Sequence, residues 1–208
     1  MVDGYAGYND VAESSRIRVG CWAHLRRKLF EARGAAAEAD ELLAFIQALY
    51  RVEHDVARDN LLGTPLHLAR RTELSTRIVE AFEAWIAAHA AAYSPKHPLT
   101  VALTYFTNQR TALRRFLTDP ALPLDNNAAE RALRIIALGR KNFLFAGHCE
   151  GAQNFAILQS LVSTCQLHGV NPYAYLRDVL LRVQWPGVTA DELMPWNWSP
   201  PPSEPAAA

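Results

Sequence analysis

The chain carries the sequence DNNAAERALR at residues 125–134, followed by GRKN at residues 139–142. The segment opens with residues that cap a helix, and it places the carboxylate of Glu130 in the first helical turn. An α-helix advances about 100° per residue, so Arg134 and Lys141 lie within roughly 40° of Glu130 around the axis. One acid flanked by bases on a helix face is typical of a site that holds a metal ion and binds a phosphate backbone.

The same residues also have a purely structural interpretation. Asn127 to Glu130 is an acceptable capping box, in which the Glu130 side chain hydrogen-bonds back to the start of its own helix. Glu130 and Arg134 also have the spacing of an ordinary i,i+4 ion pair. Taken alone, the segment favours this structural interpretation, and the rest of the chain has to decide between the two.

The composition fits one or two globular domains. Of 208 residues, 50% are hydrophobic and 20% are charged, and 21 basic residues balance 21 acidic ones. Because the net charge is zero, nucleic-acid binding would need a local cluster of basic side chains. Such clusters are more often solvated helix faces than binding sites. They occur at Arg26–Lys28, Arg70–Arg71, Arg114–Arg115 and Arg131–Lys141.

The cysteines and the N-terminal sequence indicate a cytoplasmic protein. Cys21, Cys149 and Cys165 form no C-x-x-C pair, which is typical of reduced thiols in the cytosol. Cys21 with His24, and His148 with Cys149, have atypical spacing for zinc ligands, so a zinc site is not favoured. The sequence shows neither a signal peptide nor an apolar run of membrane-spanning length.

Apolar periodicity predicts a mainly helical chain. The one predicted strand is Arg16–Cys21, which alternates polar and apolar residues; residues 143–145 are a possible short extended stretch. Thr64 is expected to cap the third helix, with Pro65 at its first position. A single strand needs partners, so it is either isolated or part of a larger sheet. The predicted helices cover residues 22–33, 37–60, 65–93 and 98–117, a segment through Glu130, residues 151–168, and a last segment from about residue 172.

The apolar stripes of these helices are expected to form the core. Trp196 and Trp198 are expected to dock on it, and the Pro- and Ala-rich tail from Ser199 is expected to be disordered. The positions predicted to be buried include Leu74, Phe82, Trp85, Leu99, Leu103, Phe106, Leu113, Phe116, Phe155, Leu158, Cys165, Tyr175 and Leu180.

Six segments, in order along the chain, resemble the C-terminal part of transposases of the insertion-sequence-66 family. Together they extend over almost the whole sequence, and their shared order is more specific than any one of them. They are DGYAGY (3–8), GCWAHLRRKLF (20–30), DNNAAERALR (125–134), LGRKNFLFAG (138–147), GVNPYAYL (169–176) and LMPWNW (193–198).

The resemblance implies a DDE transposase, in which two aspartates and a glutamate bind two divalent cations, Mg²⁺ or Mn²⁺. Asp3 matches the second aspartate and Glu130 matches the glutamate, although an Asp-Gly pair is more often a simple turn. Carboxylate oxygens suit Mg²⁺, and two such ions activate a nucleophile and stabilise the leaving oxygen at phosphorus. The reaction would cut and join DNA phosphodiester bonds.

The resemblance also sets the expected architecture: mainly α, with a truncated RNase H-like (α/β) core, an all-helical insertion and a helical C-terminal region. The expected parts are residues 1–34 and 119–168 for the core, 35–118 for the insertion, 169–198 for the C-terminal region and 199–208 for the tail. The expected partners are transposon-end DNA and target DNA, together with full-length transposase or a second copy. The residues expected to contact DNA are Arg131, Arg134, Arg140, Lys141, Asn126, Asn127, His24, Arg26 and Arg27.

Departures from the family pattern lead us to expect a chain with little activity alone. The first catalytic aspartate and the DNA-recognition region of the family would lie upstream of Asp3. Residues 148–151 read HCEG where the family pattern is Ser-Asp-Arg-Gly, so one positive charge is lost. The alternative is a non-catalytic helical module that associates with DNA or with full-length transposase.

Overall fold

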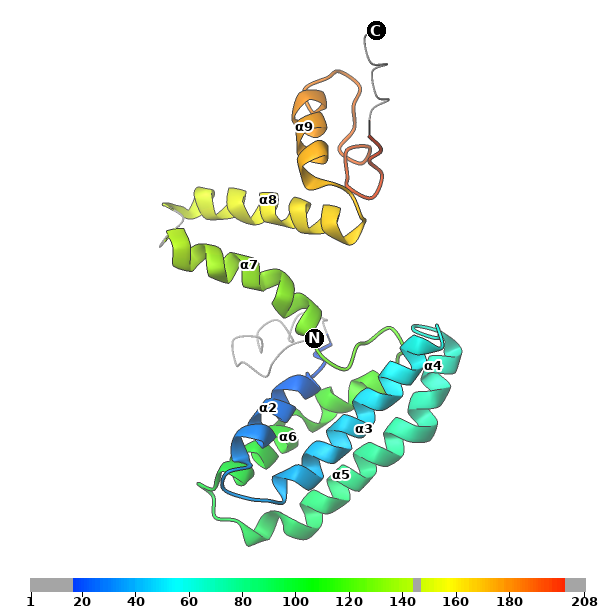
Figure 1. The fold of residues 1–208 in the computed structure, drawn as a ribbon, viewed down its shortest axis with the longest axis vertical. Coiled ribbons are helices and arrows are strands. Elements are labelled where there is room, and N and C mark those ends of the chain that lie inside the picture. Colours follow the sequence, from blue (N-terminus) through cyan, green and yellow to red (C-terminus); the bar gives the residue numbers. More distant parts are fainter. Residues whose placement is uncertain (1–16, 144–146, 201–208) are drawn as a thin grey trace. The chain divides into compact units, whose positions relative to one another are not determined.

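The computed structural model describes residues 17–143 and 147–200, except for the side chains of residues 140–143 (Figure 1). The chain divides after Ala128 into two compact units. In the first unit the helices are α2 (Trp22–Ala32), α3 (Ala39–Arg58), α4 (Pro65–Arg70), α5 (Thr76–His89) and α6 (Pro98–Arg114). The helix α7 (Asn127–Phe143) begins at the boundary, and α8 (Cys149–Leu167) and α9 (Pro172–Arg182) follow in the second unit.

The core of the first unit is built around α2, which packs against α3 and α6. Its apolar residues recur at helical spacing, so that Trp22, Leu25 and Leu29 all lie on one fully buried stripe. The Trp22 ring forms T-shaped contacts with Phe82 and Phe116, whose ring centroids lie 5.8 and 6.1 Å from its own. Its Nε1 donates a 2.9 Å hydrogen bond to the carbonyl of Leu113, so the indole N–H is satisfied inside the core.

The predicted strand Arg16–Cys21 is wrong for the residues of it that the structure describes. Residues 17–19 have no regular structure, and Gly20 is an isolated bridge residue whose N–H donates a hydrogen bond to the carbonyl of Ala112 at 2.9 Å. Gly20 lies against helix α6, and within the described ranges no strand runs beside the segment, as a regular strand would need. A Cβ on Gly20 would lie 2.9 Å from the backbone nitrogen of Leu113, so glycine permits the close approach.

The helix predicted over residues 65–93 is interrupted. As predicted, Thr64 caps α4 by accepting a hydrogen bond from the N–H of His67, and Pro65 is the first helical residue. A π-helical turn, η2 (Arg71–Ser75), then precedes α5, and a 3₁₀ turn, η3 (Ala90–Ala92), follows it. The wider turn shifts the helical register, so Leu74, predicted to be buried, is 39% exposed while Arg71 is buried.

The helix predicted over residues 98–117 is confirmed as α6 followed by the 3₁₀ turn η4 (Arg115–Leu117). All five of its predicted core residues are buried. Glu83 of α5 accepts hydrogen bonds from Arg110 and Arg114 of α6, and the Arg110 contact is the main reason that the pKa of Glu83 is lowered. This charged cluster joins α5 to α6 at the surface.

In the second unit, the C-terminal residues fold back on α9. Asn171 caps α9 by accepting hydrogen bonds from two backbone N–H groups. The hydroxyl of buried Tyr175 donates to the carbonyl of Leu193, and Trp198 Nε1 donates to Asp178, both at 2.8 Å. Docking of Trp198 is thus confirmed, whereas Trp196 remains 55% exposed.

Several apolar residues of α7, α8 and α9 are exposed, contrary to the predicted core. Phe155 and Leu158 are 38% and 50% exposed and Leu180 is 66% exposed, while Cys165 and Tyr175 are buried as predicted. The helical periodicity was right, but these apolar positions have too few packing partners in the described part of the second unit. Residue 143, predicted to be extended, is the last residue of α7.

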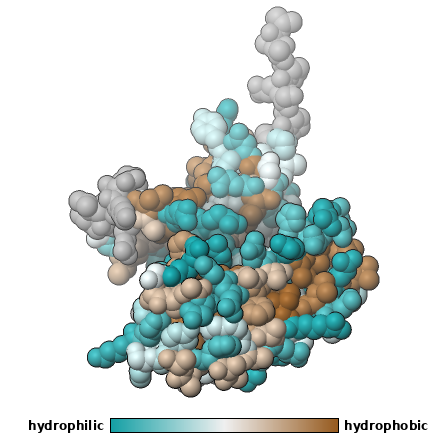
Figure 2. Space-filling model, turned by 60° about the horizontal axis from the view of Figure 1, so that its bottom comes forward, coloured by the Kyte–Doolittle hydropathy of each residue, from teal (hydrophilic) through white to brown (hydrophobic). Residues whose placement is uncertain are grey.

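The surface of the molecule is mixed in character. Hydrophilic residues cover much of the face that Figure 2 shows, and hydrophobic residues gather in places between them. Within the described ranges, no helix combines the length and the apolar character that crossing a bilayer requires.

Candidate functional site

The turn before α7, residues Asp125–Asn127, is the best-defined part of the candidate site. The Asp125 carboxylate accepts a 2.7 Å hydrogen bond from the hydroxyl of Tyr50 on α3. It also accepts two bonds from Asn127, one from the backbone N–H at 3.0 Å and one from the side-chain amide at 2.8 Å. Asp125 therefore closes the turn that begins α7, as a capping residue does.

The turn is anchored to α2 on its other side. The N–H of Trp22 donates to the carbonyl of Leu124 at 3.2 Å, and the N–H of Asn126 points to Cys21 Sγ at 3.5 Å. Burial raises the pKa of the Cys21 thiol. Burial, followed by the hydrogen bond to Asp125, raises the pKa of Tyr50 far above its usual range. Tyr50 thus stays protonated and serves as a donor to Asp125.

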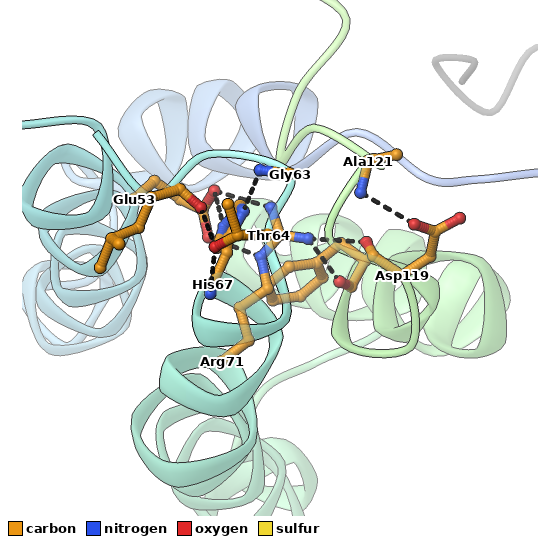
Figure 3. Close-up of polar contacts among 9 residues, drawn as sticks. Glu53, Gly63, Thr64, His67, Arg71, Asp119 and Ala121 are labelled. Atoms are coloured by element: carbon orange, nitrogen blue, oxygen red, sulfur yellow. Dashed lines mark hydrogen bonds and ion pairs between the residues drawn. The ribbon is translucent and has the colours of Figure 1, made fainter. Parts of the chain in front are cut away.

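A buried ion pair holds the loop that leads into this turn (Figure 3). Arg71 of η2 is completely buried and binds Glu53 of α3 through two parallel hydrogen bonds of 2.8 and 2.7 Å. Its remaining nitrogen, Nη1, donates to the carbonyls of Phe116 and Asp119, at 2.7 and 2.9 Å. The guanidinium thereby ties two helices to the start of the loop.

His67 completes this network. Its Nδ1 accepts a hydrogen bond from the N–H of Gly63 at 3.2 Å, and its Nε2 lies 3.1 Å from Glu53 Oε2. Because Nδ1 is an acceptor, we assign the ring hydrogen to Nε2, which donates to Glu53. The interpretation of Arg70–Arg71 as a solvated basic cluster is therefore wrong for Arg71, because the π-helical turn directs that residue into the core.

The structure places the predicted site residues as follows. On α2, Arg26 and Arg27 are exposed and His24 is half-buried; on α7, Arg131 and Arg134 are exposed. Asn126, Asn127 and Glu130 are half-buried, with Glu130 in the first turn of α7. Asp3 lies outside the described residues, as do the side chains of Arg140 and Lys141, although both of these residues belong to α7.

Three of these residues, from two separate segments, line one hollow. Arg26, Arg27 and Asn127 line a space of about 630 Å³ between α2, α3 and the start of α7, which we call the α2 hollow. Its complete lining is Ala23, Arg26, Arg27, Phe30, Tyr50 and Asn127.

The described residues do not by themselves form a site for two divalent cations. No three histidine, cysteine or acidic side chains gather anywhere in the described ranges. Both carboxylate oxygens of Asp125 are engaged by hydrogen bonds. Glu130 is the one predicted ligand that the structure describes, so a shared site with Asp3 stays a prediction.

The roles of Tyr50, Glu53 and Arg71 were not predicted from the sequence. One signal was available for Glu53, because it lies four residues after Leu49 and three before Val56 on the buried stripe of α3. A carboxylate on such a stripe requires a buried cationic partner. The apolar periodicity of residues 65–93 did not predict the π-helical turn that contains the cationic partner, Arg71.

Comparison with known proteins identifies related sequences over nearly the whole chain. A family model described as "Transposase IS66 family" matches residues 1–154, and one described as "IS66 C-terminal element" matches residues 160–196. The uncharacterized protein y4qI of Sinorhizobium fredii is 34% identical over a 213-residue alignment that covers 96% of this chain. The uncharacterized protein y4jD of the same organism is 32% identical over a 210-residue alignment that covers 95% of this chain.

The matched region is only part of these relatives. The chain spans 39% of the length of y4qI and 40% of the length of y4jD. No solved structure matches this chain.

Proposed function

Because the chain belongs to the IS66 transposase family, we propose that it acts in DNA transposition as the C-terminal part of a DDE transposase. The observation that carries this proposal is the anchored turn at Asp125–Asn127. It begins α7, so Glu130 falls in the first turn of that helix. The start of the segment that supports the resemblance, Asp125–Asn127, is therefore anchored at α3 and at Cys21, directly before α2.

In the proposed enzyme, residues 1–34 and 119–168 belong to an RNase H-like core that residues 35–118 interrupt as a helical insertion. Glu130 and Asp3 supply oxygen ligands of the kind that Mg²⁺ prefers. The bound ions would supply activation of the attacking oxygen and stabilisation of the leaving oxygen. The part of the insertion around Glu53 and Arg71 positions the loop that ends at Asp125.

The exposed arginines of α7 are proposed to hold the DNA backbone, which makes binding dependent on salt. Each phosphate contact contributes about −0.9 to the slope of log K against log salt concentration. We expect the double variant Arg131→Gln/Arg134→Gln to reduce the magnitude of this slope by about 2 and to weaken binding to all duplex sequences alike. Titrations of a labelled transposon-end duplex at several salt concentrations measure both effects.

A matched control separates this contact from a general change in charge. Arg51 and Arg77 are exposed arginines of the first unit with no predicted role, and Arg51→Gln/Arg77→Gln removes the same charge. The control should keep the slope of the parent chain. An equal reduction in the two double variants would contradict a specific role for α7, and a parent chain that binds no duplex would contradict the proposed function.

A non-catalytic binding module is the second candidate, and the exposed apolar residues of the second unit favour it. Leu133 and Leu138 of α7 are 61% and 53% exposed, and Ile157 of α8 is 58% exposed. Apolar residues on several sides of a helix favour burial against further protein. The proposed occupant is the part of a full-length transposase that lies outside the matched region of the relatives. If the DNA upstream of this coding sequence encodes, in the same reading frame, a further aspartate on a predicted strand, the catalytic candidate would be favoured instead.

A further inference from the structure

The α2 hollow combines features that none of the proposed roles uses together. Ala23, Arg26, Arg27 and Phe30 follow one another at i, i+3, i+4 and i+7, so one face of α2 forms the wall of the hollow. Tyr50 of α3 and Asn127 of α7 complete the lining. The volume, about 630 Å³, is within the range of small-molecule pockets, about 300–1,000 Å³.

Phe30 has the character of a stacking platform. It is 55% exposed, although its neighbours Leu29 and Leu25 on the same helix are completely buried. The guanidinium of Arg33 lies over the Phe30 ring, 5.3 Å from its centroid. Asp40 holds Arg33 through a contact of 2.6 Å, so the stacked arrangement is itself anchored. An aromatic ring fixed in this way and still open to solvent offers a π-surface to a planar ligand.

The rest of the lining suits a phosphate and a polar base edge. Arg26 and Arg27 are exposed, and neither takes part in any ion pair within the described ranges. Asn127 donates one side-chain hydrogen bond to Asp125 and also lines the hollow. Two guanidinium groups beside an open aromatic ring are the elements by which proteins bind single-stranded nucleic acid.

We propose that the α2 hollow binds an unpaired nucleotide of single-stranded DNA, with its base stacked on Phe30 and its phosphate held by Arg26 and Arg27. This inference rests on the proposed role in transposition, and it specifies the form of DNA that this face of the first unit binds. A paired base cannot stack on Phe30 in the same way, because its faces are already covered by neighbouring base pairs. The hollow therefore distinguishes a frayed or displaced strand from duplex.

The test compares binding of a labelled single-stranded oligonucleotide and of its duplex to the full chain. We expect Phe30→Ala to weaken single-strand binding about tenfold and duplex binding less than about twofold, since stacking on an aromatic ring is lost. Phe30→Trp should retain single-strand binding. It should also show, relative to the parent chain, additional quenching of tryptophan fluorescence by the single strand. The matched control is Tyr173→Ala, which removes an exposed aromatic residue that is not in the lining.

Each result has a distinct meaning. Equal single-strand affinities for Phe30→Ala and Tyr173→Ala would overturn the inference, while salt-dependent duplex binding would leave the proposed function standing. A parent chain that binds neither DNA form would overturn both. If Phe30→Ala loses its helical circular dichroism, the Phe30→Trp variant provides the test. Additional fluorescence quenching by the single strand would support a nucleotide stacked on residue 30, and the absence of additional quenching would overturn the inference.

Discussion

Replacement of Arg71 by methionine is expected to destabilise the first unit by about 3–5 kcal/mol, which is a large fraction of a typical domain stability of about 5–15 kcal/mol. The substitution leaves Glu53 charged, only 16% exposed and without its bidentate partner. It also removes the donor to the carbonyls of Phe116 and Asp119. Urea denaturation followed by circular dichroism measures the loss as a lower midpoint.

Two further variants show whether the buried pair is the cause. Arg77→Met removes an exposed arginine of α5 and should change stability by less than about 0.5 kcal/mol. The double variant Arg71→Met/Glu53→Met leaves no uncompensated charge, so it should lose less stability than Arg71→Met alone. If Arg71→Met is no more destabilising than Arg77→Met, the network does not hold the loop.

Replacement of Glu130 by glutamine is expected to reduce Mg²⁺-dependent cleavage of transposon-end DNA at least about a hundredfold in a protein that joins this chain to the upstream part of y4qI. Glutamine is informative because a capping box accepts either Glu or Gln at this position. The substitution therefore preserves the capping role expected of Glu130, and it removes the charge that a metal site or an ion pair with Arg134 would use. We expect the unjoined chain to show no cleavage. Gel analysis of an end-labelled duplex measures cleavage by the joined protein, by its Glu130→Gln variant and by the unjoined chain.

Glu150→Gln is the matched control, because Glu150 is an exposed acid in the first turn of α8. It should leave cleavage by the joined protein unchanged. Full activity of the Glu130→Gln protein would show that the structural interpretation of this segment is sufficient. Cleavage by the unjoined chain that Glu130→Gln abolishes would contradict our expectation that the chain needs an upstream part.

Much of the fold was predictable because helical periodicity and capping residues are local signals. Thr64 and Pro65 start α4 as predicted, and the apolar stripe of α6 is buried at every predicted position. The strand predicted at Arg16–Cys21 is wrong for its described residues, because alternation alone does not reveal that Gly20 lies against a helix. The exposure of Leu74 was missed for a similar reason, since a π-helical turn leaves no periodic signature.

The candidate site was only partly readable from sequence. Asp125 to Asn127 was singled out as the start of a helix, and the structure shows why those residue types are needed there. The partners Tyr50 and Cys21 lie 75 and 105 residues away in the chain, and only tertiary packing brings them to the turn. Tertiary packing also explains Arg71, which was predicted to be a solvated surface residue but is buried.

We propose that the carboxylates of Asp3 and Glu130 bind the same metal ions. A crystal structure of the joined protein with Mn²⁺ and transposon-end DNA, with the metal located by anomalous scattering, tests it directly. We predict that an oxygen of each carboxylate coordinates Mn²⁺ within one two-metal site, together with an acid from the upstream part. Carboxylates of Asp3 and Glu130 on different sides of the fold, or a complete acidic triad made by other residues, would contradict the account.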